Sequence, residues 1–109
     1  MDQLSIRQLP EPGAFALVGE LDMLSAEAVV SSLKVASEDR DLVLELSELR
    51  FMDSSGIRAI LQVASDRNNG SRVVLRNATP AVERVLDIAL PGDIPGLLVA
   101  SRNEGATRG

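Results

Sequence analysis

The sequence contains no cysteine, no histidine, no tryptophan and no tyrosine, and each absence excludes a kind of chemistry. Without cysteine there are no disulfides and no thiolate reactions, which is compatible with a reducing cytosol. Without histidine, the usual general base of serine hydrolases and the commonest zinc ligand are both missing. We therefore expect no catalytic residues, no metal site and no cofactor.

Aromatic residues and basic residues are also scarce. Phe15 and Phe51 are the two aromatic residues, so the chain has no stacking platform for single-stranded nucleic acid. Sixteen acidic side chains outnumber eleven basic ones, for a net charge of −5, whereas phosphate backbones require a basic surface. We expect no nucleic acid partner, and a surface suited to a basic or mixed protein partner.

Long apolar runs are missing as well. No segment approaches the roughly 20 apolar residues that span a bilayer, and the first nine residues do not resemble a signal peptide. We expect a cytoplasmic protein without direct membrane insertion. The 109 residues suffice for one domain, with a core over about residues 4–100 and a flexible polar tail over residues 101–109.

Five short apolar or alternating segments have the pattern of strands. They are Leu4–Arg7, Ala14–Val18, Leu42–Leu46, Arg72–Arg76 and Leu97–Val99. The turn residues Pro10–Gly13 predict that the first two strands form a hairpin. Leu42–Leu46 has a single polar interruption, which suits a strand covered on both faces. A turn over Ser47–Arg50 is expected to follow it.

Three segments have apolar residues at helical spacing. Their expected buried residues are Val29, Val30, Leu33 and Ala36 in the first, Ile57, Ile60, Leu61 and Ala64 in the second, and Val82, Val85, Leu86 and Ala89 in the third. Ser25 can cap the first helix, the second runs from about Ser55 to Asn68, and Thr79 caps the third ahead of Pro80. Strands that alternate with helices predict an α/β domain with right-handed crossovers.

The segment Asp53-Ser54-Ser55-Gly56 stands at the start of the second helix. Local chemistry alone favours a capping role for Asp53 or Ser54, because both residue types are common N-caps. A hydroxyl at this place could also carry a phosphate, since helix N-termini accommodate anions. Gly56 fits either interpretation, because a residue without Cβ permits a close backbone approach or an unusual turn.

Four segments together resemble the STAS domains of bacterial anti-sigma-factor antagonists. They are Gly19-Glu20-Leu21-Asp22, Leu44-Glu45-Leu46-Ser47, Phe51-Met52-Asp53-Ser54-Ser55-Gly56-Ile57 and Ala78–Leu86. The similarity covers roughly residues 4–100. It implies a single α/β domain with a mixed sheet of four to five strands, an N-terminal hairpin, and helices packed mainly on one face.

The resemblance also implies a function. In that family, the serine directly after the aspartate is phosphorylated by the cognate anti-sigma factor, an ATP-dependent serine kinase, and here that serine is Ser54. The unphosphorylated domain would bind the kinase and release a sigma factor, and a serine phosphatase would reset the switch. On chemistry alone, Ser55 remains an alternative acceptor and an alternative N-cap.

The expected partner-binding surface combines the segment with its surroundings. Its residues are Glu20, Asp22, Asp53, Ser54, Ser55, Gly56, Arg58 and Gln62, with Asp66 as a further exposed position on the same helix. For Glu20 and Asp22, a turn with a capping aspartate is an equally acceptable interpretation. For Arg58, Gln62 and Asp66 the alternative is an ordinary solvated helix surface.

Two other functions remain as alternatives, and the sequence differs from the family pattern at two places. Ser54 or Ser55 could be a nucleophile paired with Lys34, the single lysine, although nothing in the spacing supports such a pair. STAS domains also serve as scaffolds of stress-signalling assemblies and as cytosolic subunits of membrane transporters. The family usually has Asp or Asn at the position of Glu45, and no final helix is evident after Val99.

Overall fold

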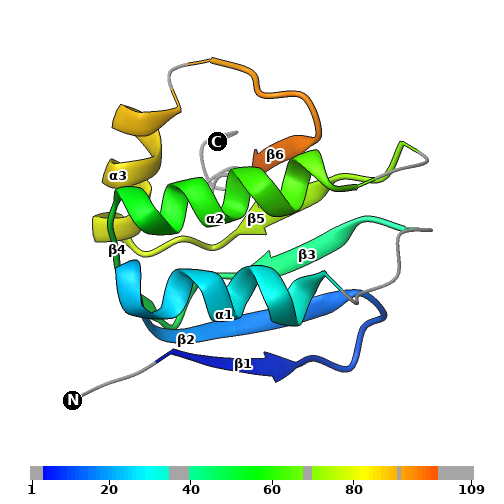
Figure 1. Ribbon diagram of the computed structural model, residues 1–109, viewed down its shortest axis with the longest axis horizontal. Coiled ribbons are helices and arrows are strands. Elements are labelled where there is room, and N and C mark those ends of the chain that lie inside the picture. Colours follow the sequence, from blue (N-terminus) through cyan, green and yellow to red (C-terminus); the bar gives the residue numbers. More distant parts are fainter. Residues whose placement is uncertain (1–3, 35–39, 68–69, 91, 101–109) are drawn as a thin grey trace, which may run out of the picture.

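A mixed β-sheet with three helices forms the structure, which is a computed structural model describing residues 4–34, 40–67, 70–90 and 92–100 (Figure 1). The strands are β1 (Ser5–Gln8), β2 (Ala14–Leu21), β3 (Leu42–Glu45), β4 (Leu49–Met52), β5 (Val73–Arg76) and β6 (Leu97–Ala100). The helices are α1 (Met23–Leu33), α2 (Ser54–Ser65) and α3 (Pro80–Ala89). The predicted α/β class and the N-terminal hairpin are confirmed.

The sheet has the order β1-β2-β3-β5-β6, with β4 paired to β2 outside this path. β1 runs antiparallel to β2, and the other pairings are parallel. The described residues therefore form six strands, and the predicted number of four to five was wrong. The additional strand is β4, which includes the last two residues of the turn expected over Ser47–Arg50, whereas Ser47 and Glu48 do form a turn.

β4 was missed because its sequence does not alternate. Its two end residues, Leu49 and Met52, are buried, while Arg50 and Phe51 between them are exposed. The strand is defined by a tertiary contact: it pairs with the second half of β2, after the register shift between Gly19 and Glu20. β2 accordingly continues to Leu21, three residues beyond the predicted end at Val18.

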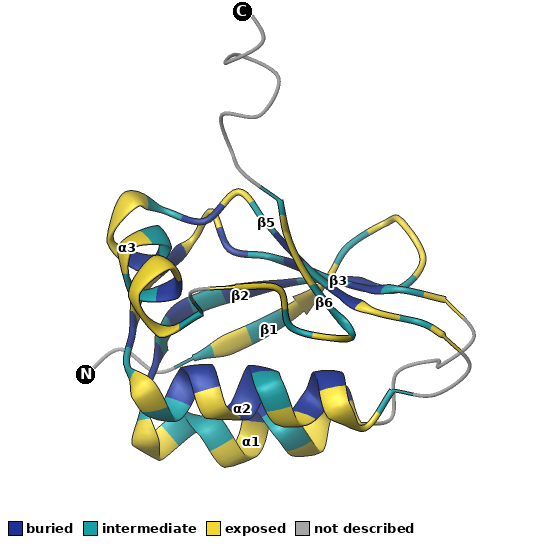
Figure 2. Cartoon of the chain, turned by 90° about the horizontal axis from the view of Figure 1, so that it is seen from above, coloured by how far each residue is buried: buried dark blue, intermediate teal, exposed yellow. Residues whose placement is uncertain are grey.

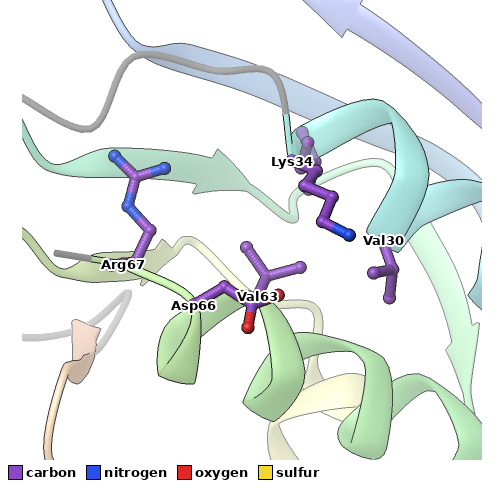
Figure 3. A pocket seen from close by; sticks show the side chains of 6 residues that line it. Val30, Lys34, Val63, Asp66 and Arg67 are labelled. Atoms are coloured by element: carbon purple, nitrogen blue, oxygen red, sulfur yellow. The ribbon is translucent and has the colours of Figure 1, made fainter.

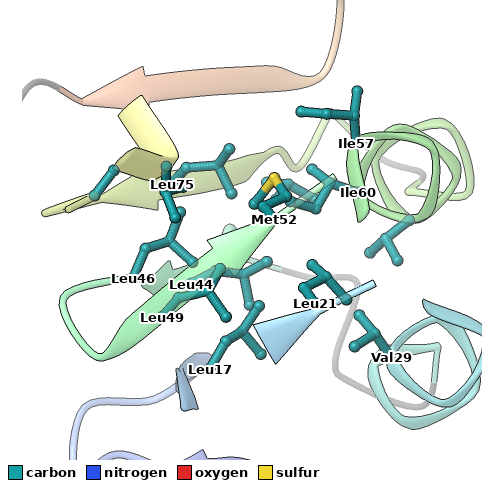
Figure 4. Packing of buried hydrophobic residues seen from close by; sticks show 14 of the residues in the cluster. Leu17, Leu21, Val29, Leu44, Leu46, Leu49, Met52, Ile57, Ile60 and Leu75 are labelled. Carbon is teal, nitrogen blue, oxygen red and sulfur yellow. The ribbon is translucent and has the colours of Figure 1, made fainter. Parts of the chain in front are cut away.

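α1 and α2 lie side by side on one face of the sheet, and α3 lies at the end of the sheet near β4 (Figures 1 and 2). The core fills the space between the sheet and the helices, as the side chains of Leu17, Leu21, Leu44, Ile60 and Leu75 illustrate (Figure 4). The sequence predicted that β3 is covered on both faces. This prediction was wrong in part, because Val43 and Glu45 are only partly buried.

α3 begins as its sequence predicts. Thr79 is the N-cap and accepts a hydrogen bond from Val82 N, and Pro80 is the first helical residue. The Thr79 hydroxyl also donates to the carbonyl of Leu49 at 3.0 Å, which ties α3 to β4. None of the helices in the described part of the chain is long and apolar enough to cross a membrane. Ala36, Asn68 and the tail over residues 101–109 lie outside the described residues.

Candidate functional site

The first turns of α1 and α2 lie next to each other because of the register between β2 and β4. Leu21, the last residue of β2, is paired with Met52, the last residue of β4. The next residue in each strand is an aspartate, Asp22 or Asp53, and each aspartate is the N-cap of the helix that follows. The amide of Asp53 also donates to the carbonyl of Leu21 at 3.3 Å. The parallel strands β2 and β4 thus place the capped starts of α1 and α2 at the same end of the domain.

The start of α1 is a closed capping box. Asp22 Oδ1 accepts hydrogen bonds from the amides of Leu24 and Ser25, at 3.0 and 3.2 Å. Ser25 Oγ accepts from the amide of Asp22 and donates to the carbonyl of Glu20, both at 3.0 Å. Ser25 is therefore the third residue of the helix and not its N-cap, which corrects the prediction. The capping interpretation of Asp22 is confirmed.

The start of α2 has the same cap but leaves its hydroxyls unused. Asp53 Oδ1 accepts from the amides of Ser55 and Gly56, at 2.9 and 3.2 Å. Ser54 and Ser55 are the first two helical residues, so the alternative in which Ser55 is the N-cap was wrong. Ser54 is exposed and Ser55 is half-buried, and neither hydroxyl has a hydrogen-bond partner among the described residues.

Gly56 is required by a close approach. A Cβ at this position would lie 2.8 Å from Cγ of both Leu21 and Met52, and 3.0 Å from the carbonyl oxygen of Leu21. The first turn of α2 therefore packs directly against the ends of β2 and β4. This packing fixes where the Ser54 side chain leaves the domain surface.

A groove between α1 and α2 runs next to the two helix starts. It has a volume of about 460 Å³, and Met23, Glu27, Ser55, Arg58 and Gln62 are among its lining residues. Met23 and the adjacent Leu24 are 74% and 84% exposed, which is unusual for large apolar side chains at the start of a helix. Such exposed apolar side chains in a polar surround are typical of protein interaction surfaces.

Charged residues of both signs border the two helix starts. Glu20 is a residue of β2, not of a loop, and its carboxylate lies 3.9 Å from the guanidinium of Arg50. On α2, Ser54, Arg58 and Gln62 are all exposed and follow one another at intervals of four residues, so they form one solvent-facing stripe. The structure therefore brings the predicted partner-binding residues to one end and one helix face.

The opposite ends of α1 and α2 enclose a second, smaller hollow of about 220 Å³ (Figure 3). Val30, Lys34, Val63, Asp66 and Arg67 line it, so Asp66 belongs to this end and not to the surroundings of Ser54. Lys34 also lines the larger groove, but as the C-cap of α1 it lies eleven residues after Met23, or about 16 Å along the helix axis from the start of α1. A general base must come within hydrogen-bond reach of its nucleophile, so this position does not support a pair of Lys34 with Ser54 or Ser55.

A polar ladder that was not expected from the sequence joins the hairpin turn to β3 and β5. Arg76 donates to Glu45 and to Glu11, each at 2.6 Å, and Asn77 donates to Glu45 at 3.1 Å. Burial works to raise the pKa of Glu45, but the hydrogen bonds from Ser47, Arg76 and Asn77 outweigh it and hold the pKa below its ordinary value. Glu45, which departs from the family pattern, thus has a structural role in this chain.

The fold is a single α/β domain, and its candidate site lies at the carboxyl ends of two parallel strands. Residues 3–95 match the STAS domain family, and the chain belongs to that family. The fold is shared with solved structures, among them the following two. The anti-sigma factor antagonist SpoIIAA, solved in its unphosphorylated form, is 22% identical, with a TM-score of 0.58 over 99% of this chain and 96% of SpoIIAA. An anti-sigma factor antagonist from Mycobacterium paratuberculosis is 20% identical, with a TM-score of 0.68 over 99% of this chain and 93% of that protein.

Proposed function

We propose that this chain is an anti-sigma factor antagonist whose binding to an anti-sigma serine kinase is switched off by phosphorylation of Ser54. The observation that carries the proposal is the exposed Ser54 hydroxyl, which follows the capping Asp53 and has no hydrogen-bond partner among the described residues. Its setting, a STAS domain with the fold of two anti-sigma factor antagonists, supports this function. The unphosphorylated form would bind the kinase in the cytoplasm and release a sigma factor, and a serine phosphatase would restore this form.

Ser54 is a better acceptor than the other two serines at this end. The Ser25 hydroxyl is engaged in the capping box of α1, so its modification would break that cap. Ser55 is half-buried and lines the groove between the helices. Ser54 is exposed, and the cap of α2 uses the carboxylate of Asp53 instead of the Ser54 hydroxyl.

A phosphate on Ser54 would change the charge of the surface more than its shape. The amides of Ser55 and Gly56 already donate to Asp53, so they are not free to donate to a phosphate. The phosphate would add nearly two negative charges beside the carboxylates of Asp53 and Asp22. A partner that docks on Met23, Leu24 and Ser54 must desolvate this patch. Like charges at an interface cost several kcal/mol, so we expect an affinity loss of about a hundredfold or more.

The fold should survive the modification. Ser54 is exposed, and the hydrogen bonds that start α2 come from Asp53, so none of the observed contacts must break. Acidic groups are also favourable near a helix N-terminus. Phosphorylation would therefore act by blocking a partner and not by unfolding the domain.

Titration of an anti-sigma kinase with three variants tests the proposal. Ser54→Asp should bind at least about tenfold more weakly than wild type, because one carboxylate carries about half the charge of a phosphate. Ser54→Ala should bind like wild type. Ser32→Asp adds the same charge at an exposed position near the end of α1 and should also bind like wild type. Unchanged circular dichroism would show that all three are folded, and wild-type affinity of Ser54→Asp would refute the mechanism.

A further inference from the structure

We propose that Arg58 pairs with the phosphate of Ser54 and thereby leaves the partner-binding groove when the serine is modified. This inference rests on the proposed phosphorylation of Ser54 and adds a residue that responds to it. Arg58 is exposed and lies one helical turn after Ser54 on the same stripe of α2. Side chains four residues apart on a helix have Cβ atoms about 5–6 Å apart, within the reach of a phosphoserine and an arginine.

The pairing is favoured because the guanidinium of Arg58 has no competing partner in the part of the chain that the structure describes. No ion pair or hydrogen bond of its side chain exists among the described residues. Arg50, which lies earlier in the chain, already faces Glu20 at 3.9 Å. Lys34 lines both the groove and the hollow at the opposite ends of the helices, eleven residues after the start of α1, and Arg67 lines that hollow. Of these four basic residues, Arg58 is therefore the one placed to meet a phosphate at the start of α2.

The cap of α2 strengthens the case for a side-chain partner. Asp53 occupies the amides of Ser55 and Gly56, so a phosphate on Ser54 cannot take both of them without displacing the cap. An anion that precedes an arginine by four residues is also oriented favourably with respect to the helix dipole. Glu27, on α1, is the acidic residue that lines the same groove, and its carboxylate carries less charge than a phosphate.

Phosphorylation would therefore change the charge of this surface in two ways. In the unmodified protein, Arg58 lines the groove together with Met23 and Gln62 and is available to an acidic group of a partner. In the phosphorylated protein, the same guanidinium would neutralise part of the new charge. The end of the groove next to Ser54 would thus lose the Arg58 cation when the adjacent helix start gains an anion, and Lys34 would remain at the other end.

The test uses full-length protein in which phosphoserine is incorporated at position 54 during translation, so that no kinase is needed. Phosphorus NMR then measures the second pKa of the phosphate, which is about 6 when unperturbed. Wild type should show a pKa about 0.3–0.5 units lower than Arg58→Gln, as expected for an exposed ion pair. Arg58→Lys should keep much of this shift, because it keeps the charge.

A charge-matched swap is the decisive control. The double variant Arg58→Gln, Gln62→Arg keeps the net charge but moves the cation one turn further, about 12 Å along the axis from Ser54. It should behave like Arg58→Gln. Equal pKa values in wild type and Arg58→Gln, or a wild-type value in the swap, would overturn the pairing. Because the phosphate is installed without a kinase, failure of the kinase to modify Ser54 would refute the proposed function and leave this result standing.

Discussion

The two helix starts share a cap and differ in everything that follows it. α1 begins with Asp22-Met23-Leu24-Ser25 and α2 with Asp53-Ser54-Ser55-Gly56, and in each case the aspartate carboxylate binds the amides two and three residues later. In α1 the third helical residue is a serine whose hydroxyl completes the capping box, and the first two residues are exposed and apolar. In α2 the third is a glycine packed against the strands, and the first two carry unused hydroxyls.

The difference separates residues that the fold needs from residues that it does not. Asp22, Ser25, Asp53 and Gly56 start the helices and bring them against the sheet. Met23, Leu24 and Ser54 contribute little to either cap or core, and they are the side chains exposed at this end. We infer that the first group positions the surface and that the second group contacts the partner.

The largest effect on stability is expected at Gly56. Gly56→Ala places a Cβ at 2.8 Å from two side chains and 3.0 Å from a backbone oxygen, and relief of that overlap should cost about 1–3 kcal/mol. Urea unfolding measures this change. Gly92→Ala is the matched control, because a Cβ there has no neighbour within 4 Å, and it should change stability by less than about 0.5 kcal/mol. Equal effects of the two variants would show that α2 does not need the close approach.

A smaller effect is expected for the apolar residues of α1, and it should appear in binding. Met23→Ser combined with Leu24→Ser removes two exposed apolar side chains, and we expect affinity for the kinase to fall about tenfold. Unfolding stability should stay within about 0.5 kcal/mol of wild type. Ile88→Ser removes a side chain that is 77% exposed on α3, and it should leave affinity unchanged. If both variants bind like wild type, the start of α1 is not part of the surface.

Removal of either cap should cost about 1 kcal/mol. Asp22→Ala and Asp53→Ala each leave two helix amides without their acceptor. Asp22→Ala should be the more destabilising of the two, because it also removes a partner of the Ser25 hydroxyl. Urea unfolding of both variants, with the exposed Asp87→Ala of α3 as control, measures the difference. A larger loss for Asp53→Ala would contradict the comparison of the two caps.

The smallest effect should lie away from both helix starts, in the ladder of Glu11, Glu45 and Arg76. The pKa of Glu45 is below its ordinary value of 4.5, so its ionised form stabilises the fold at neutral pH, and this contribution is lost as the pH falls below about 4.5. Glu45→Gln should therefore lower stability by up to about 1 kcal/mol at pH 7 and approach wild type near pH 3. Urea unfolding across this pH range tests it. Coincident curves for the two proteins would show that Glu45 does not stabilise the fold, and a constant offset would show that its ionisation is not the cause.

Elements with local signals were predictable from the sequence. α3 begins at Thr79 and Pro80 as expected, because a capping hydroxyl and a proline at the first helical position are both local features. β4 was not predictable, because its four residues become a strand only by pairing with the far half of β2. The cap of α1 was assigned to the wrong residue, because Asp22 and Ser25 are both good N-cap residues and the capping box uses both.

The helix cap at the candidate site was predictable from the sequence, but the surroundings of the site were not. Family resemblance indicated Ser54, and the local sequence indicated a cap by Asp53 or Ser54, of which the structure selects Asp53. The groove beside Arg58 depends on how two helices pack, and the contact of Glu11 with Arg76 joins residues 65 positions apart. Neither feature leaves a periodic or local pattern that a single sequence would reveal.

Mass spectrometry of the kinase-treated protein tests the central claim most directly. Incubation with an ATP-binding anti-sigma kinase and ATP, followed by trypsin, yields the peptide Phe51–Arg58, which contains both Ser54 and Ser55. We predict a single phosphate that fragmentation assigns to Ser54, that disappears in Ser54→Ala, and that persists in Ser55→Ala. A phosphate on Ser55, with Ser54 unmodified, would contradict the account.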